Sequence, residues 1–353
     1  MPGFGEESAP RLIESLPPAA SVETLDLGFL PILVRPQPEE VAESKLLTAA
    51  VGALRANGYR RASILLEDYR RGSTQSRIIR CLHGWTLALA GELELARNMA
   101  TALVSGEDPA APGPAYLMGV VLDGQGREAD AFAWYQLALR AAPSDADLLV
   151  RTARTGSKAG DPRFVLQCLE TLDRRGALSL ELEPLRAQAL AEAGEGESAL
   201  LVYDLLLGQL GENPDFLEEA GLCAFGLGNE RDDPDFFSLA ADYFSRAVEF
   251  NPQDSRASYN LGCALDWGGD ASGAEMAYMR ALEVKPDYLF AAENLAELFL
   301  REGREQEARS VLEEQLRQPL PDTVRSRLSA RLKRASNEEA SASRGNGAER
   351  LQP

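Results

Sequence analysis

Small, apolar and polar residues follow one another along this chain at helical spacing, and the pattern recurs about every 34 residues. Glycine marks the period, with successive separations of 33, 35, 34, 34, 34, 41 and 34 residues, at Gly58, Gly91, Gly126, Gly160, Gly194, Gly228, Gly269 and Gly303. A small or compact residue lies seven positions before each glycine, and another lies five positions after most of them. This period predicts one supersecondary unit that is repeated along the chain.

Each recurring position has a physical role in a pair of helices. A glycine directly after a helix can adopt the left-handed backbone conformation, so it ends the first helix and begins the turn. Small residues on the facing sides of two helices let their axes approach closely. A large residue four positions after the second small one continues the buried stripe, at Tyr135, Leu169, Tyr203, Phe244, Tyr278 and Leu312. The sixth unit fits only with a seven-residue insertion after Gly228, which places Ala240 at the second small position.

The repeated pattern resembles the tetratricopeptide repeat. Residues 255–288 match nearly every signature position, residues 112–145 also match well, and the resemblance extends over about residues 44–322. It implies an all-α fold, a right-handed superhelical solenoid of about eight helix-turn-helix repeats. Because such repeats bury their apolar faces only by stacking, we expect the last one to be capped.

The segments outside the repeats have a different character. Residues 323–335 are predicted to form the capping helix, because Val324, Leu328 and Leu332 lie at i, i+4 and i+8. Residues 336–353 are rich in Ser, Gly, Asn and Glu and are predicted to be a disordered tail. Residues 1–43 are acidic and proline-rich, which predicts an arm that is partly disordered or folded onto the first repeats.

Composition narrows the class of partner. The 353 residues are 45% hydrophobic and carry 55 acidic against 36 basic side chains, a net charge of -19. This charge repels phosphate backbones and argues against a nucleic-acid partner. The sequence has no signal-peptide pattern and no apolar stretch of roughly 18 residues, so we expect a cytoplasmic protein without membrane insertion.

The sequence contains no recognisable catalytic constellation. A single histidine, His83, lies beside a tight-packing glycine and is interpreted as a packing residue, since catalysis also requires a nucleophile or an orienting partner. Four cysteines are scattered among four repeats, which favours apolar fillers over a metal site. We therefore expect a non-enzyme with no cofactor and no metal.

The resemblance implies where a partner would bind. In tetratricopeptide proteins the first helix of each repeat lines a concave groove, and repeat positions 2, 5, 6, 9 and 12 or 13 face it. These positions share one side of a helix. Projected onto this chain, they give the candidate partner-binding residues Trp85, Tyr116, Val120, Arg151, Arg154, Lys158, Tyr259, Asn260, Asp266, Asn294 and Glu297.

The candidates fall into three chemical groups. Asn260 and Asn294 occupy the same position of successive repeats, where an amide can bind the backbone of an extended peptide. The basic residues Arg151, Arg154 and Lys158 can bind an acidic segment, or simply form a solvated face. The aromatic residues can anchor a partner or pack between repeats.

Three functions remain open on this basis. The first is a protein-interaction scaffold or adaptor that holds a partner peptide or helix in the groove. The second is a client-holding chaperone similar to those of type III secretion. The third is a self-assembling structural protein, because residues 44–80 carry eight basic and two acidic side chains whereas residues 212–242 carry nine acidic and one basic. Opposite charges on the first and sixth repeats permit homo-oligomers.

Overall fold

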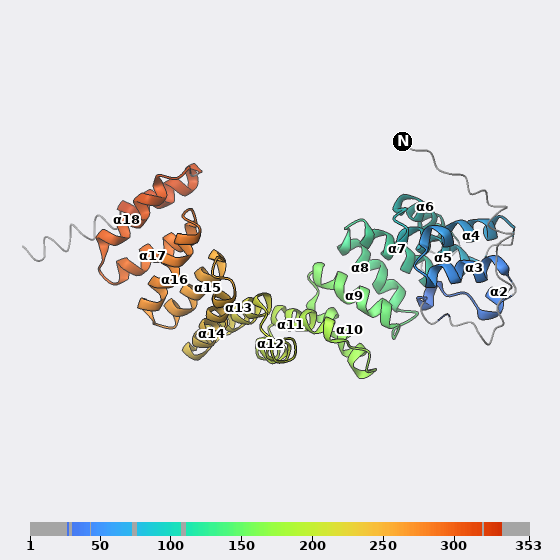
Figure 1. Cartoon of the computed structure of the whole chain (residues 1–353), viewed down its shortest axis with the longest axis horizontal. Coiled ribbons are helices and arrows are strands. Elements are labelled where there is room, and N and C mark those ends of the chain that lie inside the picture. The colour runs from blue at the N-terminus through green and yellow to red at the C-terminus, as the bar shows by residue number, and fades with distance from the viewer. Residues whose placement is uncertain are drawn as a thin grey trace, which may run out of the picture. The chain divides into compact units, whose positions relative to one another are not determined.

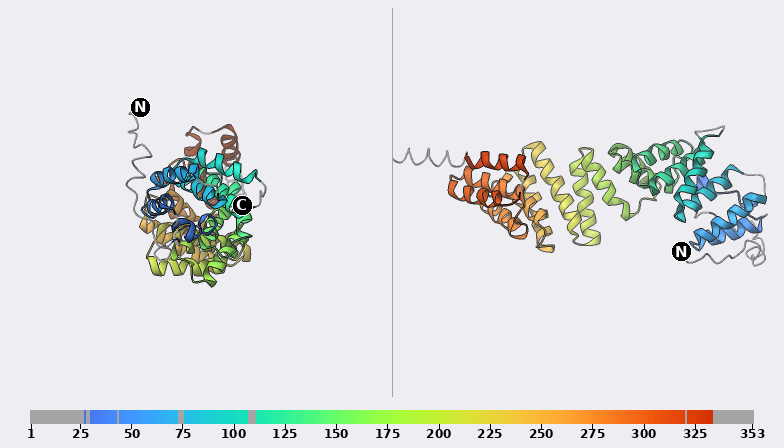
Figure 2. Two further views of the ribbon diagram at one scale, coloured as in Figure 1. Left: turned by 90° about the vertical axis from the view of Figure 1, so that its right-hand side faces the viewer. Right: turned by 90° about the horizontal axis from the view of Figure 1, so that it is seen from above.

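The 34-residue period becomes a series of antiparallel helix pairs, each consisting of an A helix and the B helix that follows it (Figures 1 and 2). The computed structural model describes residues 27, 30–42, 44–72, 76–106, 111–319 and 321–333. Within these ranges all regular structure is helical, which confirms the predicted all-α repeat fold. The chain divides into two compact units, Met1–Leu185 and Arg186–Pro353.

The first unit contains four helix pairs. Adjacent A and B helices pack side by side, and each B helix also packs on the next A helix within the unit. The helices are α3 (Lys45–Arg55), α4 (Tyr59–Gly72), α5 (Arg77–Leu89), α6 (Leu93–Val104), α7 (Pro112–Gly124), α8 (Glu128–Leu139), α9 (Ala146–Lys158) and α10 (Pro162–Arg174).

The second unit contains the other pairs, and its boundary falls within the first of its helices. That helix follows the short 3-10 turn η3 (Leu180–Leu182). The helices are α11 (Glu183–Glu192), α12 (Gly196–Leu210), α13 (Pro214–Arg231), α14 (Pro234–Phe250), α15 (Ser255–Trp267), α16 (Ala271–Val284), α17 (Leu289–Arg301) and α18 (Glu305–Leu316).

Two of the eight glycines that mark the period do not adopt the left-handed conformation that the sequence pattern predicts for them. Six of them have a positive φ in the turn, but Gly58 and Gly228 do not. In those repeats Asn57 and Asp232 take the left-handed conformation instead, with φ of 56° and 53°. Gly228 lies inside α13, so the seven extra residues lengthen α13 and α14 rather than forming a loop.

Close contact between the two helices of a pair is made by glycine against an aromatic ring. A Cβ built on Gly119, Gly221 or Gly262 would lie 2.5, 2.6 and 2.5 Å from the ring of Tyr135, Phe244 and Tyr278, respectively. Each glycine is on an A helix and each ring is on the following B helix. The ring therefore occupies the space of the missing side chain and sets the distance between the helices.

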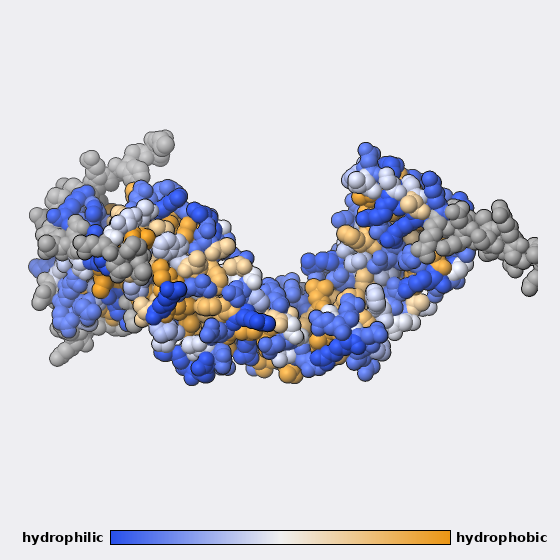
Figure 3. Space-filling view, turned by 180° about the vertical axis from the view of Figure 1, so that it is seen from behind, coloured by the Kyte–Doolittle hydropathy of each residue, from blue (hydrophilic) through white to orange (hydrophobic). Residues whose placement is uncertain are grey.

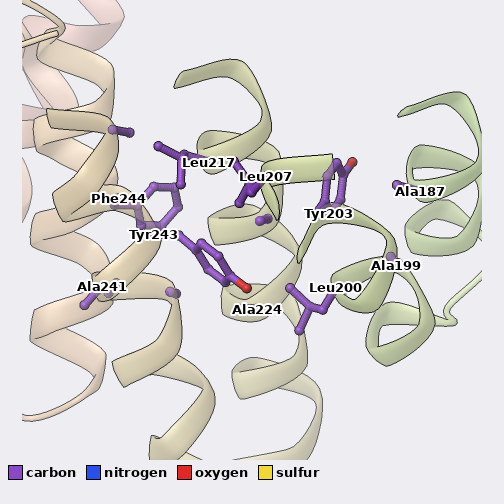
Figure 4. Close-up of a cluster of buried hydrophobic side chains, with 14 of the residues drawn as sticks. Ala187, Ala199, Leu200, Tyr203, Leu207, Leu217, Ala224, Ala241, Tyr243 and Phe244 are labelled. Carbon is purple, nitrogen blue, oxygen red and sulfur yellow. The ribbon is translucent and has the colours of Figure 1, made fainter. Parts of the chain in front are cut away.

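The core of the second unit consists of two clusters that follow one another along its helices. One cluster joins buried residues from α11 to α15, and Figure 4 shows Tyr203, Leu217 and Phe244 within it. Another cluster continues through α16, α17 and α18 to residues 322–333, which form a helix with Leu328 fully buried. Arg327 of this helix donates to the carboxylate of Glu293 on α17 at 2.8 Å.

Part of the N-terminal arm is also described. Residues 30–36 contain the 3-10 turn η2 (Ile32–Val34), and α2 (Pro38–Ala42) follows. The turn contacts α5 and α7, and α2 contacts α3. The expected disorder of the rest of the arm and of tail residues 336–353 concerns positions outside the described ranges. In the described part of the chain, no helix has the length and apolar character needed to cross a bilayer.

Replacing Gly262 with alanine tests the glycine-to-ring contact. Because a Cβ there meets the Tyr278 ring, we expect Gly262→Ala to lower the free energy of unfolding by about 1–3 kcal/mol. The matched control is Gly208→Ala in α12, where nothing lies within 4 Å; better helix propensity should raise stability there by about 0.5–1 kcal/mol. Urea denaturation followed by circular dichroism measures both, and shifts of the same sign would contradict the contact.

Candidate functional site

The apolar candidates on the A helices of the first unit are buried. Trp85 is 7% exposed, Tyr116 is 1% exposed and Val120 is also buried. The Tyr116 hydroxyl donates to Oδ2 of Asp147 on α9 at 2.7 Å, so its polar end is already satisfied. In this structure these three side chains pack between elements, which for Trp85 and Tyr116 is the alternative to an exposed groove anchor.

The basic candidates on α9 do not form an open cluster. Arg151 donates to Oδ2 of Asp147 at 2.8 Å, and Lys158 donates to Glu128 on α8 at 2.5 Å. The exposed guanidinium of Arg154, by contrast, has no ion-pair partner among the described residues of this unit. Two of the three basic side chains therefore have their charges paired within the chain, and Arg154 is the one that faces solvent without such a pair.

The two candidate asparagines have different environments. The Asn294 amide, on α17, donates to the hydroxyls of Tyr259 and Tyr278 at 3.4 Å each and to Sγ of Cys263 at 3.5 Å. This network links α15, α16 and α17, so Asn294 has a structural role. Asn260 is half-buried on α15, and its side chain makes no hydrogen bond among the described residues.

The acidic candidates lie on the same two helices. Asp266 on α15 accepts a hydrogen bond from Arg301 on α17, which ties the two A helices together. Glu297 is half-buried on α17. Of the candidates in the second unit, Asn260 has an amide without a hydrogen bond in the described part of the chain, and Tyr259 has a half-buried ring. These two groups are available to a partner.

An aromatic patch that the sequence analysis did not list surrounds Tyr259. The ring of Tyr259 lies 5.3 Å from that of Tyr288 and 6.3 Å from that of Phe290, measured between centroids. Phe290 is 57% exposed although two other rings lie beside it. We refer to Tyr259, Tyr288 and Phe290 as the aromatic patch. Phe290 occupies repeat position 2, so the projection used above could have found it.

Positive charge lies at the edge of the aromatic patch. The ammonium of Lys285 is 5.5 Å from the centroid of the Tyr288 ring. Arg256 on α15 is exposed, and its guanidinium donates to Oε2 of the buried Glu218 on α13 at 2.5 Å. Burial raises the pKa of the Glu218 carboxyl, and the positive charge of Arg256 partly offsets this increase. The guanidinium of Arg256 is thus held by one carboxylate while much of it still faces solvent.

The surface of the second unit also has isolated apolar residues elsewhere. Figure 3 shows hydrophobic patches within a mainly hydrophilic surface. Leu201 on α12, Phe250 at the end of α14 and Met276 on α16 are exposed, and they lie on B helices. Of these three only Phe250 has a ring, and within the described residues that ring makes no contact of the kind found in the aromatic patch.

The single histidine has the environment of a packing residue. His83 is buried on α5, with Nε2 3.3 Å from the Ser63 hydroxyl and Nδ1 3.6 Å from Oε2 of Glu67. Burial lowers the pKa of its imidazole, and the Glu67 carboxylate opposes this. Over the described ranges, no group of three or more His, Cys, Asp or Glu side chains is arranged to hold a metal ion.

The arrangement of these helix pairs is similar to that of proteins of known structure. No protein-family model matches the chain. The C-terminal part of a TPR repeat-containing protein from Cytophaga hutchinsonii aligns with 70% of this chain and 98% of its own, at 15% identity and a TM-score of 0.51. The chain therefore has the fold of tetratricopeptide-repeat proteins. YrrB, a TPR protein with an unusual peptide-binding site, covers 54% of this chain and 95% of its own at 19% identity and a TM-score of 0.43.

The chain also has a relative by sequence. Protein O-mannosyl-transferase TMTC1 from Homo sapiens is 26% identical over 192 residues, which is 54% of this chain. The match spans only 21% of that protein's length. The transferase activity in that name therefore belongs to TMTC1, of which the matched part is about a fifth.

Substituting each asparagine separately tests the difference between them. Asn294→Ala removes the donor that links three helices, so we expect it to lower the free energy of unfolding by about 1–2 kcal/mol. Asn260→Ala should change stability by less than about 0.5 kcal/mol, as a surface substitution does. Urea denaturation of both variants decides the point. An equal loss from the two would show that Asn260 is also part of the internal network.

The pH dependence of stability tests the environment of His83. Because burial lowers the pKa of the folded imidazole below its usual 6.5, the unfolded chain binds the proton more readily. The stability contributed by neutral His83 is therefore present above pH 6.5 and is lost as the pH falls towards the folded pKa. We expect His83→Gln to lose less stability than the wild type between pH 7.5 and 5.5, measured by urea midpoints. Equal losses would contradict a lowered pKa.

Proposed function

We propose that this protein is a non-catalytic interaction scaffold whose second unit binds a short partner segment across α15 and α17. The observation that carries the proposal is the aromatic patch. Three rings from two consecutive repeats contact one another and remain partly exposed, with no further segment of the described chain covering Phe290. Clustered, partly exposed tyrosine and phenylalanine side chains are typical of the anchors that dominate binding energy.

The groups around the aromatic patch define the chemistry of the partner. An apolar or proline side chain of the partner would pack on Tyr259 and Phe290, since aromatic rings bury large areas at low entropic cost. The free amide of Asn260 can both donate to and accept from a peptide backbone. Arg256 and Lys285 favour a carboxylate next to the apolar side chain. The proposal is therefore an extended, apolar and acidic segment.

Polar contacts between the helices keep the site in place. Asn294 donates to Tyr259 and Tyr278, and Arg301 donates to Asp266, so the two A helices are linked at two points beyond the patch. Little ordering is then required of the protein when a partner binds. Less conformational entropy lost on binding means a higher affinity for the same contacts.

A pair of matched phenylalanine variants tests the site. Phe290 and Phe250 have nearly the same exposure, 57% and 59%, but only Phe290 is in the aromatic patch. We expect peptides selected on the wild type from a phage-displayed random library to bind Phe290→Ala at least about tenfold more weakly, a loss of about 1.4 kcal/mol or more. Binding to Phe250→Ala should be unchanged.

The same measurement can reject the proposal. Equal affinity of the selected peptides for the wild type and Phe290→Ala would show that they bind elsewhere. Equal weakening by Phe250→Ala would indicate adhesion to exposed apolar residues in general. Enrichment of basic rather than acidic sequences would contradict the role given to Arg256 and Lys285.

A further inference from the structure

The A helices of the first unit differ from α15 and α17 because a segment of the same chain lies on them. The turn η2 contacts both α5 and α7. We refer to residues 30–36 as the arm segment. It has the sequence LPILVRP, and its apolar residues Leu30 and Val34 are 1% and 0% exposed. Both of its prolines are also buried.

The main chain of the arm segment lies on groove positions of the repeats. A Cβ built on Gly113, at repeat position 2 of α7, would be 2.9 Å from the carbonyl oxygen of Leu33 and 3.2 Å from Sγ of Cys81. Cys81 is at repeat position 5 of α5. Glycine at 113 therefore permits a close backbone approach that any larger residue would prevent. A partner peptide would use the same two positions.

The arm segment is held in its conformation by local hydrogen bonds, within itself and to Leu27 just before it. The amide of Val34 donates to the carbonyl of Pro31 at 3.0 Å, and that of Leu30 donates to the carbonyl of Leu27 at 3.0 Å. The Arg35 guanidinium donates to the carbonyl of Leu30 from Nε at 3.0 Å. Two prolines further restrict the free segment. A short, preordered, apolar chain is the form in which proline-containing ligands bind.

We infer that the face of α5 and α7 is a second peptide-binding surface, which the arm segment occupies as an intramolecular ligand. This goes beyond the function proposed for α15 and α17. The surface fits a short segment with two apolar anchors four residues apart and a proline between or beside them. A tethered ligand has an effective concentration on the order of millimolar, so a competing partner must bind well or act after the arm is displaced.

Cys81 reports whether the arm segment is in place. Its thiol is buried beside Gly113, and burial raises the pKa of that thiol to about 12, so it should react slowly with alkylating reagents. Cys168, on α10 of the same unit, is also buried with its pKa raised to about 12. Mass spectrometry resolves the two sites, and Cys168 then serves as an internal control for unfolding.

Two full-length variants displace the arm segment from opposite sides. Leu30→Asp/Val34→Asp places charges on its anchors, and Gly113→Ala adds a Cβ beneath its backbone. The matched control is Gly52→Ala in α3, where nothing lies within 4 Å. We expect iodoacetamide to label Cys81 at least about tenfold faster in both variants than in the wild type or the control, with Cys168 unchanged. A synthetic peptide of residues 27–42 should restore protection of Cys81 in the double variant.

Several results would overturn the inference. Unchanged labelling of Cys81 in both variants would show that the arm segment does not cover the face. Faster labelling of Cys168 in parallel would show that the arm segment is part of the folded core of the unit. Exposed Cys81 that the peptide fails to protect would show that the face is not a peptide site. Wild-type protection that depends on protein concentration would assign the occupant to a second copy.

Discussion

The close approach of the two helices in each pair is the constraint on which the rest of the structure depends. In three of the pairs it is set by a glycine on the A helix that faces an aromatic ring on the B helix, namely Gly119 with Tyr135, Gly221 with Phe244 and Gly262 with Tyr278. Once these rings are used between helices, the outer sides of the A helices are left to carry other groups. Their chemistry then differs from repeat to repeat without affecting the packing.

The two units use that freedom in different ways. In the first, the apolar side chains Trp85, Tyr116 and Val120 at groove positions are buried, and a short proline-containing segment of the same chain lies over α5 and α7. In the second, Asn294 and Asp266 link α15 and α17, and the rings of Tyr259 and Phe290 remain accessible. A single repeat architecture thus offers one covered surface and one open surface, and the proposed function rests on the open one.

The fold could be predicted from the sequence because its signal is local and repeated. The prediction was wrong where another residue takes the left-handed conformation expected of a glycine. Asp232 ends α13, so Gly228, which was expected in the turn, lies inside the helix. The site could be predicted only in part. Burial of Tyr116 depends on Asp147, 31 residues away, and the role of Asn294 depends on tyrosines in two other helices. Such contacts between distant residues leave no mark in a repeat pattern.

Hydrogen–deuterium exchange of the full chain, free and saturated with a peptide selected on it, tests the central claim most directly. If the open surface on the second unit is the binding site, exchange slows in α15 and α17, around Tyr259 and Phe290, while the amides of α14 and α16 keep their rates. Protection confined to the B helices, or protection centred on α5 and α7 with α15 and α17 unchanged, would contradict the account.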